Sequence, residues 1–228
     1  MSYANGPRIV TNNLGLYLDA GNRKSYPSNG TAWNDLSGNG RGGTLTNGPT
    51  FSSENNGIFI LDGTNDYTLL NATQINALFP TSAFSIETWI KTSNTTNYMG
   101  IFCIGYALDI YYYSNSFFVI LRTALGQINT GNSNIIINDN KWHQIGFTAS
   151  STEFVWYMDG IIRHTVSSAI WDGSLSTAYA TNFSGLGRPS NLGGYFPGSM
   201  SSFKFYQKKL SNIEIAENYK ATKGRFGL

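Results

Sequence analysis

Short segments rich in β-branched and aromatic residues recur along the whole chain, and turn-forming pairs such as Asn-Gly, Asp-Gly and Gly-Asn separate them. β-Branched and aromatic side chains fit the pleated surface of a strand, whereas Asn, Asp and Gly adopt the positive φ angles of tight turns. The clearest strand-like segments are 14–19, 57–61, 84–90, 100–105, 108–113, 116–122, 134–137, 142–149 and 153–158. Many short strands at near-regular spacing are typical of a sandwich or a barrel, so the pattern predicts an all-β fold.

Alternation along two of these segments predicts which side chains share a face. In the segment 84–90, every second residue is suited to a core, and Glu87 and Trp89 belong to the opposite, mixed face. In the tyrosine trio, Tyr111 and Tyr113 are expected to face away from Tyr112. One side of the trio is therefore expected to meet solvent or a partner.

The chain is predicted to form one domain, because no Pro/Ser linker, charge block or repeat divides it. The domain is expected to span 9–221, with an N-terminal extension at 1–8 and a C-terminal tail at 222–228. A capping box, formed by Ser211 and Glu214, predicts one short helix near the C-terminus.

Composition excludes several classes of function. Only 12% of the residues are charged and the formal net charge is +2, so the chain has no electrostatic footprint for nucleic acid or for acidic lipid surfaces. A hydrophobic fraction of 41% is enough to build a core. Cys103 is the only cysteine, which excludes an intrachain disulfide. The start of the chain lacks the apolar stretch of a signal peptide, and no membrane-spanning window occurs, so synthesis in a cytoplasm without membrane insertion is expected.

A set of motifs carries a resemblance to a known family. In chain order they are Leu16-Tyr17-Leu18-Asp19-Ala20-Gly21-Asn22, Trp33-Asn34-Asp35-Leu36-Ser37-Gly38-Asn39-Gly40, Leu61-Asp62-Gly63-Thr64-Asn65-Asp66-Tyr67, Phe84-Ser85-Ile86-Glu87-Thr88-Trp89-Ile90-Lys91, Lys141-Trp142-His143-Gln144 and Lys209-Leu210-Ser211-Asn212-Ile213-Glu214. Through them, about residues 9–220 resemble the laminin-G-like, concanavalin A-like jelly-roll domain, in the form found in structural proteins of tailed bacteriophages. The resemblance implies a two-sheet antiparallel jelly-roll sandwich and a place on the virion.

Glycoside hydrolases also use this jelly roll, and their chemistry needs two carboxylates that face one groove. Glu87 is the only acidic residue of its strand, and Asp109 stands alone on another. The alternating Glu and Asp pattern of the family's hydrolases is absent. The chain is therefore predicted not to be an enzyme.

Calcium is the one cofactor that the loops suggest. Ca²⁺ prefers six to eight oxygen ligands, and Asp19, Asp35 and Asn39 supply such oxygens if the family's packing brings the first strand against the following loop. Asp62, Asn65 and Asp66 form a second cluster. The alternative is turn chemistry, because Asp, Ser and Asn side chains in such loops also bond to their own backbone.

Carbohydrate binding without catalysis is the alternative function. Exposed aromatic rings stack on the apolar faces of sugars, and the candidates for such a platform are Trp89, Tyr111, Tyr113 and Trp171. Each ring has a second interpretation, because a sandwich of this size also needs aromatic side chains in its core and at subunit contacts.

The main functional hypothesis is a non-enzymatic virion protein, a head decoration, neck or tail appendage that is made in the host cytoplasm. Its expected partners are capsid, neck or tail proteins and further copies of itself, with a possible weak contact to a host-surface glycan that several copies would strengthen. The terminal extensions are expected to anchor it. A lectin-like adhesion module is the alternative hypothesis, and a glycoside hydrolase is the third.

Overall fold

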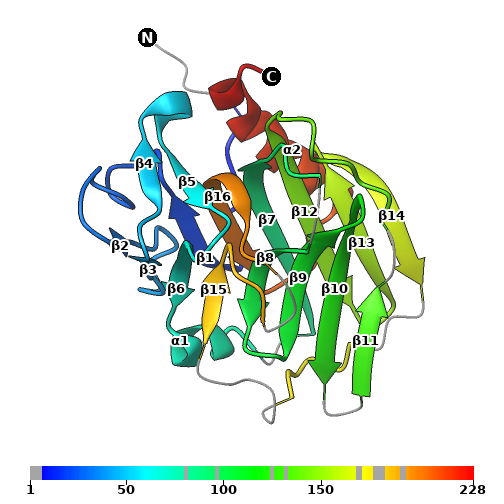
Figure 1. Ribbon diagram of the computed structural model, residues 1–228. Helices are drawn as coiled ribbons and strands as arrows, with labels where there is room; N and C mark the ends of the chain where they lie inside the picture. The colour runs from blue at the N-terminus through cyan, green and yellow to red at the C-terminus, as the bar shows by residue number, and fades with distance from the viewer. Residues whose placement is uncertain are drawn as a thin grey trace.

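The computed structural model describes residues 7–79, 82–95, 98–123, 126–130, 133–167, 171–176, 183–190 and 194–228 (Figure 1). Within these ranges, two eight-stranded antiparallel sheets pack face to face. The predicted two-sheet antiparallel sandwich is therefore confirmed, and so is the capping box at the start of the C-terminal helix.

The first sheet has the strand order β14-β13-β12-β7-β16-β5-β4, and β1 also pairs with β16. Its strands are β1 (Leu14–Asp19), β4 (Thr50–Ser52), β5 (Ile58–Asp62), β7 (Ala83–Lys91), β12 (His143–Ser150), β13 (Glu153–Met158), β14 (Ile161–Ser167) and β16 (Pro197–Tyr206). A register shift between Met200 and Ser202 divides β16, so that its first half pairs with β5 and its second half with β1.

The second sheet has the order β11-β10-β9-β8-β15-β6-β3-β2. Its strands are β2 (Ala32–Trp33), β3 (Gly43–Thr46), β6 (Tyr67–Leu70), β8 (Met99–Ile104), β9 (Leu108–Tyr113), β10 (Ser116–Thr123), β11 (Gly126–Thr130) and β15 (Ser184–Leu186). One row of paired residues crosses its middle strands from Leu69 through Gly185, Cys103 and Asp109 to Ile120. Because side chains alternate along a strand, the members of this row point to the same face of the sheet.

Aromatic side chains from both sheets fill the core between them. Phe84 of β7 stacks on Phe205 of β16 with ring centroids 5.6 Å apart, and Tyr112 of β9 packs against Phe117 of β10. Phe84 and Ile86 lie in the core while Glu87 and Trp89 point outward from the first sheet. The alternation predicted for this segment is therefore confirmed.

Helices cap the sandwich rather than build it. They are η1 (Glu54–Asn56), α1 (Ala72–Asn76), α2 (Asn212–Thr222) and η2 (Lys223–Phe226). The helix α2 packs on the outer face of the first sheet, where Ile215 joins Val155, Tyr157 and Tyr206 in a small apolar cluster. None of the helices in the described ranges combines the length and the apolar character needed to cross a membrane.

The segment 222–228, expected to be a surface tail, is largely packed against the domain. Phe226 stacks on Trp89 with ring centroids 4.2 Å apart and contacts Trp142 at 4.7 Å. Arg225 pairs with Asp19 at 2.6 Å. Where the sequence predicted a surface tail, the structure shows Phe226 and Arg225 of this segment in contact with the first sheet.

The described start of the chain meets the same region. Pro7 and Arg8 are exposed, and the backbone N–H of Val10 donates to Asn218 of α2 at 2.7 Å. Residues 1–6 of the predicted N-terminal extension lie outside the described residues.

Candidate functional site

The helices α2 and η2 cover the part of the first sheet's outer face that includes Trp89. Trp89 is only 1% exposed, because its ring lies against Tyr219 and Phe226. Its Nε1 donates to Thr222 Oγ1 at 2.9 Å. The expectation that Trp89 offers an exposed ring to a ligand is therefore wrong.

Glu87 lies beneath the same helix in a fully enclosed ion pair. Its Oε2 is 3.5 Å from Lys204 Nζ and accepts a hydrogen bond from Asn218 Nδ2 at 2.7 Å. Burial raises the pKa of Glu87, while Lys204 and Asn218 act in the opposite direction. An acid in this setting stabilises the contact between sheet and helix and does not face an open groove.

Trp171 also lies in the interior. It is 3% exposed, and its ring makes edge contacts with Phe79 at 5.6 Å and Phe84 at 5.5 Å. The expectation of an exposed ring is wrong here as well, because the core between the sheets takes up this aromatic side chain.

The outer face of the second sheet carries a stack of aromatic rings. Tyr111 lies between Tyr98, at 4.1 Å, and Phe118, at 5.2 Å, with all three rings nearly parallel. Tyr113 follows two residues after Tyr111 on β9, is 50% exposed, and lies 6.2 Å from Tyr98. We call Tyr98, Tyr111, Tyr113 and Phe118 the tyrosine face.

The structure shows which faces of the sheet Tyr111, Tyr112 and Tyr113 occupy, as the sequence analysis predicted from their alternation. Tyr112 lies in the core, whereas Tyr111 and Tyr113 share the outer face, so the predicted alternation is confirmed. Tyr111 itself is 7% exposed because its neighbours cover both sides of its ring. It supports the other rings, and Tyr113 is the most exposed residue of the four.

A buried carboxylate lies beside the tyrosine face. Asp109 is 0% exposed, and its Oδ2 accepts hydrogen bonds from Ser190 Oγ at 2.5 Å and from Tyr98 at 3.4 Å. Burial raises the pKa of Asp109 to about 6, and these hydrogen bonds oppose the effect. Asp109 is the only acidic residue in the described strands of the second sheet.

The segment after β15 folds back over this part of the sheet. A Cβ atom at Gly100 would lie 2.2 Å from the backbone nitrogen of Pro189, so the close approach requires glycine. This approach brings Ser190 to Asp109.

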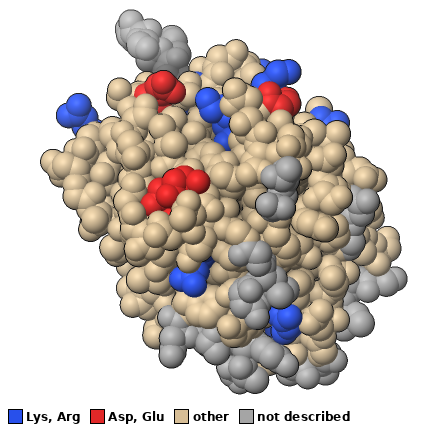
Figure 2. Space-filling model, viewed as in Figure 1, with Lys and Arg blue, Asp and Glu red and all other residues tan. Residues whose placement is uncertain are grey.

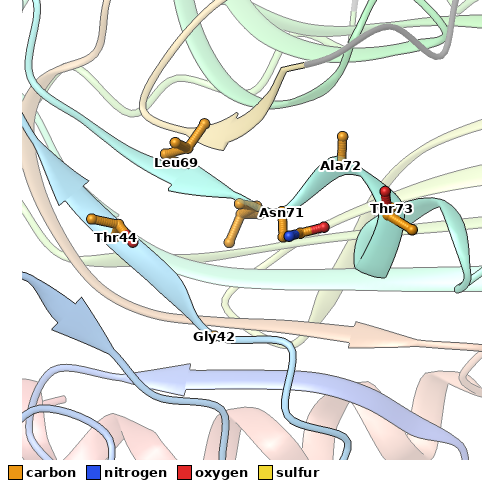
Figure 3. Close-up of a pocket in the computed structure, with 7 residues that line it drawn as sticks. Gly42, Thr44, Leu69, Asn71, Ala72 and Thr73 are labelled. Carbon is orange, nitrogen blue, oxygen red and sulfur yellow. The ribbon is translucent and has the colours of Figure 1, made fainter.

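A shallow hollow of about 420 Å³ lies farther along the second sheet. Its lining residues are Gly42, Thr44, Leu69, Leu70, Asn71, Ala72 and Thr73. Figure 3 shows Thr44 and Leu69 on neighbouring strands, with Asn71, Ala72 and Thr73 at the start of α1. Leu69 is 38% exposed and belongs to the row that contains Asp109, so the hollow opens on the same sheet face.

Hydrogen bonds occupy the carboxylate of Asp35. It accepts from the backbone N–H groups of Tyr17 at 2.9 Å, Ser37 at 2.8 Å and Arg41 at 3.0 Å. These bonds are the turn chemistry that the sequence left open as the alternative to calcium.

Asp19 and Asn39 have protein partners too. Asp19 faces the guanidinium of Arg225, and the Asn39 amide donates to the carbonyl of Gly15 at 3.2 Å. No group of three or more His, Cys, Asp or Glu side chains in the described part of the chain is arranged to hold a metal ion. Calcium binding by Asp19, Asp35 and Asn39 stays a prediction that these contacts do not favour.

Little charge is visible on the side of the molecule shown in Figure 2. Uncharged residues far outnumber Lys, Arg, Asp and Glu on it. This agrees with the low charged fraction of the whole chain, 12%. A surface of this kind suits a ligand that binds through hydroxyl, amide and ring contacts.

Comparison with known families gives one match. A laminin G-type family profile, described as Concanavalin A-like lectin/glucanases superfamily, matches residues 62–216. No curated protein matches the chain. The match agrees with the jelly-roll family that the motifs suggested, and it does not test the bacteriophage context.

Solved structures with a similar fold include receptor-binding domains of botulinum neurotoxins. The domain of the C/D mosaic serotype has a TM-score of 0.65 at 16% identity, over 92% of this chain and 52% of that chain. The serotype D ligand-binding domain in complex with N-acetylneuraminic acid has a TM-score of 0.66 at 16% identity, over 92% and 51%. A third structure has a TM-score of 0.67 at 16% identity, over 93% and 52%, and its description states that cell entry of botulinum neurotoxin type C depends upon interaction with two ganglioside molecules. This chain thus spans about half the length of these structures, and the likeness concerns the fold.

Proposed function

Because this chain belongs to the Concanavalin A-like lectin/glucanases superfamily, we propose that it is a non-enzymatic carbohydrate-binding module whose ligand binds the outer face of the second sheet. The observation that carries the proposal is the tyrosine face. There, the half-exposed ring of Tyr113 adjoins rings that are already fixed by stacking.

A fixed aromatic surface is well suited to a sugar. The C–H groups on one side of a sugar ring are apolar and pack on an aromatic ring, while its hydroxyl groups bond to nearby phenol, amide and hydroxyl groups. Because Tyr98 and Phe118 are stacked on Tyr111, these two rings have little side-chain entropy left to lose when a ligand binds beside Tyr113.

The positions of Asp109 and Glu87 support binding rather than hydrolysis. A glycosidase needs two carboxyl groups on opposite sides of the scissile bond. Asp109 has no acidic companion on the described strands of this sheet, and its Oδ2 is engaged by Ser190. Glu87 lies on the other sheet beneath α2.

The structural neighbours add support of a weaker kind. Their printed descriptions connect them with receptors, gangliosides and N-acetylneuraminic acid, so this sandwich occurs in proteins that bind glycans. Since only about half of each neighbour is matched, the support concerns the fold and no particular residue.

A glycan array tests the proposal, followed by titration with the best ligand. We expect the wild type to bind, Tyr113→Ala to lose at least about tenfold in affinity, which corresponds to about 1.4 kcal/mol, and Tyr113→Phe to keep the ring contact. Ile162→Ala removes an exposed side chain on β14 of the first sheet and serves as the matched control. An absence of binding to every glycan, or equal affinities for wild type and Tyr113→Ala, would contradict the proposal.

Placement on a virion remains a second proposal, and it rests on the sequence resemblance alone. In that setting the domain would contact capsid, neck or tail proteins, and several copies would strengthen a weak contact with a host glycan. Mass spectrometry of purified particles tests this directly, because a fixed copy number per particle is expected. Presence only in the soluble fraction of infected cells would argue against it.

A further inference from the structure

Arg188 lies flat on the outer face of the second sheet, just after β15. A Cβ atom at Gly185 would lie 2.8 Å from Arg188 Cδ, so the glycine leaves room for the arginine stem. The side chain therefore lies along the sheet rather than extending into solvent.

Two aromatic rings hold the guanidinium group. Its Cζ lies 4.7 Å from the ring centroid of Tyr67 and 4.6 Å from that of Phe183. Such contacts attract the cation and restrict the plane of the guanidinium, but they do not accept its N–H hydrogen bonds. The two rings thus position the guanidinium group and leave its N–H hydrogen bonds unmade.

No acceptor for these donors is found in the part of the chain that the structure describes. Among the residues that the structure describes, Arg188 forms no ion pair or hydrogen bond, and its Nε is buried without a partner. Arg225, by contrast, pairs with Asp19, and Arg122 donates to Gln127 Oε1 at 3.0 Å. A buried donor on a charged group is costly unless it is paired, so this site favours an acceptor from outside the chain.

The hollow of Figure 3 adjoins this arginine. Leu69, which lines the hollow, pairs with Gly185 under the arginine stem and follows two residues after Tyr67 on β6. Tyr67 and Leu69 therefore point to the same side of the sheet. The positioned guanidinium and a hollow large enough for a sugar ring lie on adjoining strands.

We propose that Arg188 binds the carboxylate of an acidic sugar, a uronic or a sialic acid, whose ring lies toward the hollow beside Leu69. The planar guanidinium donates two parallel hydrogen bonds to a carboxylate, a geometry that a neutral sugar cannot match. This inference rests on the proposed function, since it specifies the class of glycan that the same sheet face selects.

Nuclear magnetic resonance of the intact protein tests the inference with simple monosaccharides as probes. The Nε–Hε resonance of Arg188, assigned with the Arg188→Lys variant, is followed during titration with sodium glucuronate and, separately, with sodium N-acetylneuraminate. Methyl glucoside and sodium acetate at equal ionic strength are the neutral and non-sugar controls. We expect at least one acidic sugar to shift this resonance and to bind at least about tenfold more tightly than either control.

The variants provide a second measurement. Arg188→Lys keeps the positive charge but loses the paired donors, so its affinity for the acidic sugar is expected to fall at least about tenfold. Arg163→Lys, at an exposed position on β14 of the first sheet, is the matched control and is expected to bind as the wild type does. Thermal melts of both variants identify any loss of folding, and the wild-type titration stands whatever those melts show.

The outcomes separate this inference from the proposed function. An Arg188 resonance that no acidic sugar shifts, or an affinity for acetate equal to that for the sugars, overturns the inference. If neutral glycans bind through Tyr113 while Arg188→Lys changes nothing, the inference fails and the carbohydrate-binding function stands. If neither neutral nor acidic glycans bind, both fail.

Discussion

The two outer faces of the sandwich differ in whether their charged side chains have ion-pair partners. On the first sheet, α2 and η2 cover part of the face, and the charges that they enclose are paired, Glu87 with Lys204 and Asp19 with Arg225. On the second sheet, Asp109 and Arg188 have no ion-pair partner in the described part of the chain. Paired charges fix one segment of the chain on another, whereas a positioned guanidinium group without an ion-pair partner keeps the capacity to bind a ligand.

The largest effect on stability is expected from breaking the ion pair between Glu87 and Lys204 on the outer face of the first sheet. Glu87→Gln leaves Lys204 buried without its counter-charge, and a loss of about 3–5 kcal/mol in the free energy of unfolding is expected. Chemical denaturation measures this loss. The double variant Glu87→Gln with Lys204→Met is the control and should regain part of the stability. A single variant as stable as the wild type would show that the pair is unimportant.

Replacing Asp109, the acid of the second sheet without an ion-pair partner, is expected to increase stability rather than to reduce it. The pKa of Asp109 is raised to about 6 in the folded state against about 4 in an unfolded chain, so its contribution to stability is complete below about pH 4 and is lost as the pH rises through about 6. Asp109→Asn removes this loss and keeps an acceptor for Ser190. We expect it to be about 2–3 kcal/mol more stable than the wild type at pH 7 and little different at pH 4.

Melting curves at a series of pH values check this expectation. If Asp109→Asn is less stable than the wild type at every pH, the carboxylate has a favourable partner in solution, and the contrast between the two faces is lost.

A smaller loss of stability is expected from removing the contact of η2 with the first sheet. Phe226→Ala removes a half-buried ring from Trp89 and Trp142, and a loss of about 2 kcal/mol, or about 4–8 °C in melting temperature, is expected. Tryptophan fluorescence should shift to the red as water reaches Trp89. Leu228→Ala, at a residue that is 48% exposed, is the control and should change neither quantity.

The smallest effect on stability is expected in the loop of Asp35, which the sequence analysis considered as a calcium site. Asp35→Ala removes acceptors of backbone N–H groups and should cost about 1 kcal/mol, equally with added calcium and with chelator. Differential scanning calorimetry under both conditions checks this. A rise in the wild-type melting temperature that chelator reverses and Asp35→Ala abolishes would instead support the calcium prediction.

Periodicity identified which residues share a face but not what covers that face. The same alternation that correctly separated Tyr112 from Tyr111 and Tyr113 also placed Trp89 outside the core. Trp89 is nevertheless buried, because Phe226 folds onto it from a distant part of the sequence. Local pattern contains no information about such a long-range contact.

On the outer face of the second sheet, one residue could be predicted from the sequence and another could not. Ser114 and Asn115 form a two-residue turn with positive φ angles of 49° and 60°, and such a turn fixes Phe118 opposite Tyr111. The hairpin could therefore have identified Phe118. Arg188 could not be found in this way, because Tyr67 and Phe183 meet its side chain only through the folded arrangement of β6 and β15.

The meeting of Val10 with Asn218 has a practical consequence for how the domain is presented. Both ends of the described chain leave from the side of α2 and the first sheet (Figure 1). A bead, a fused protein or a solid support attached at either end would lie on the side of α2 and the first sheet. The sheet face that carries Tyr113 and Arg188 would then point toward the surrounding liquid.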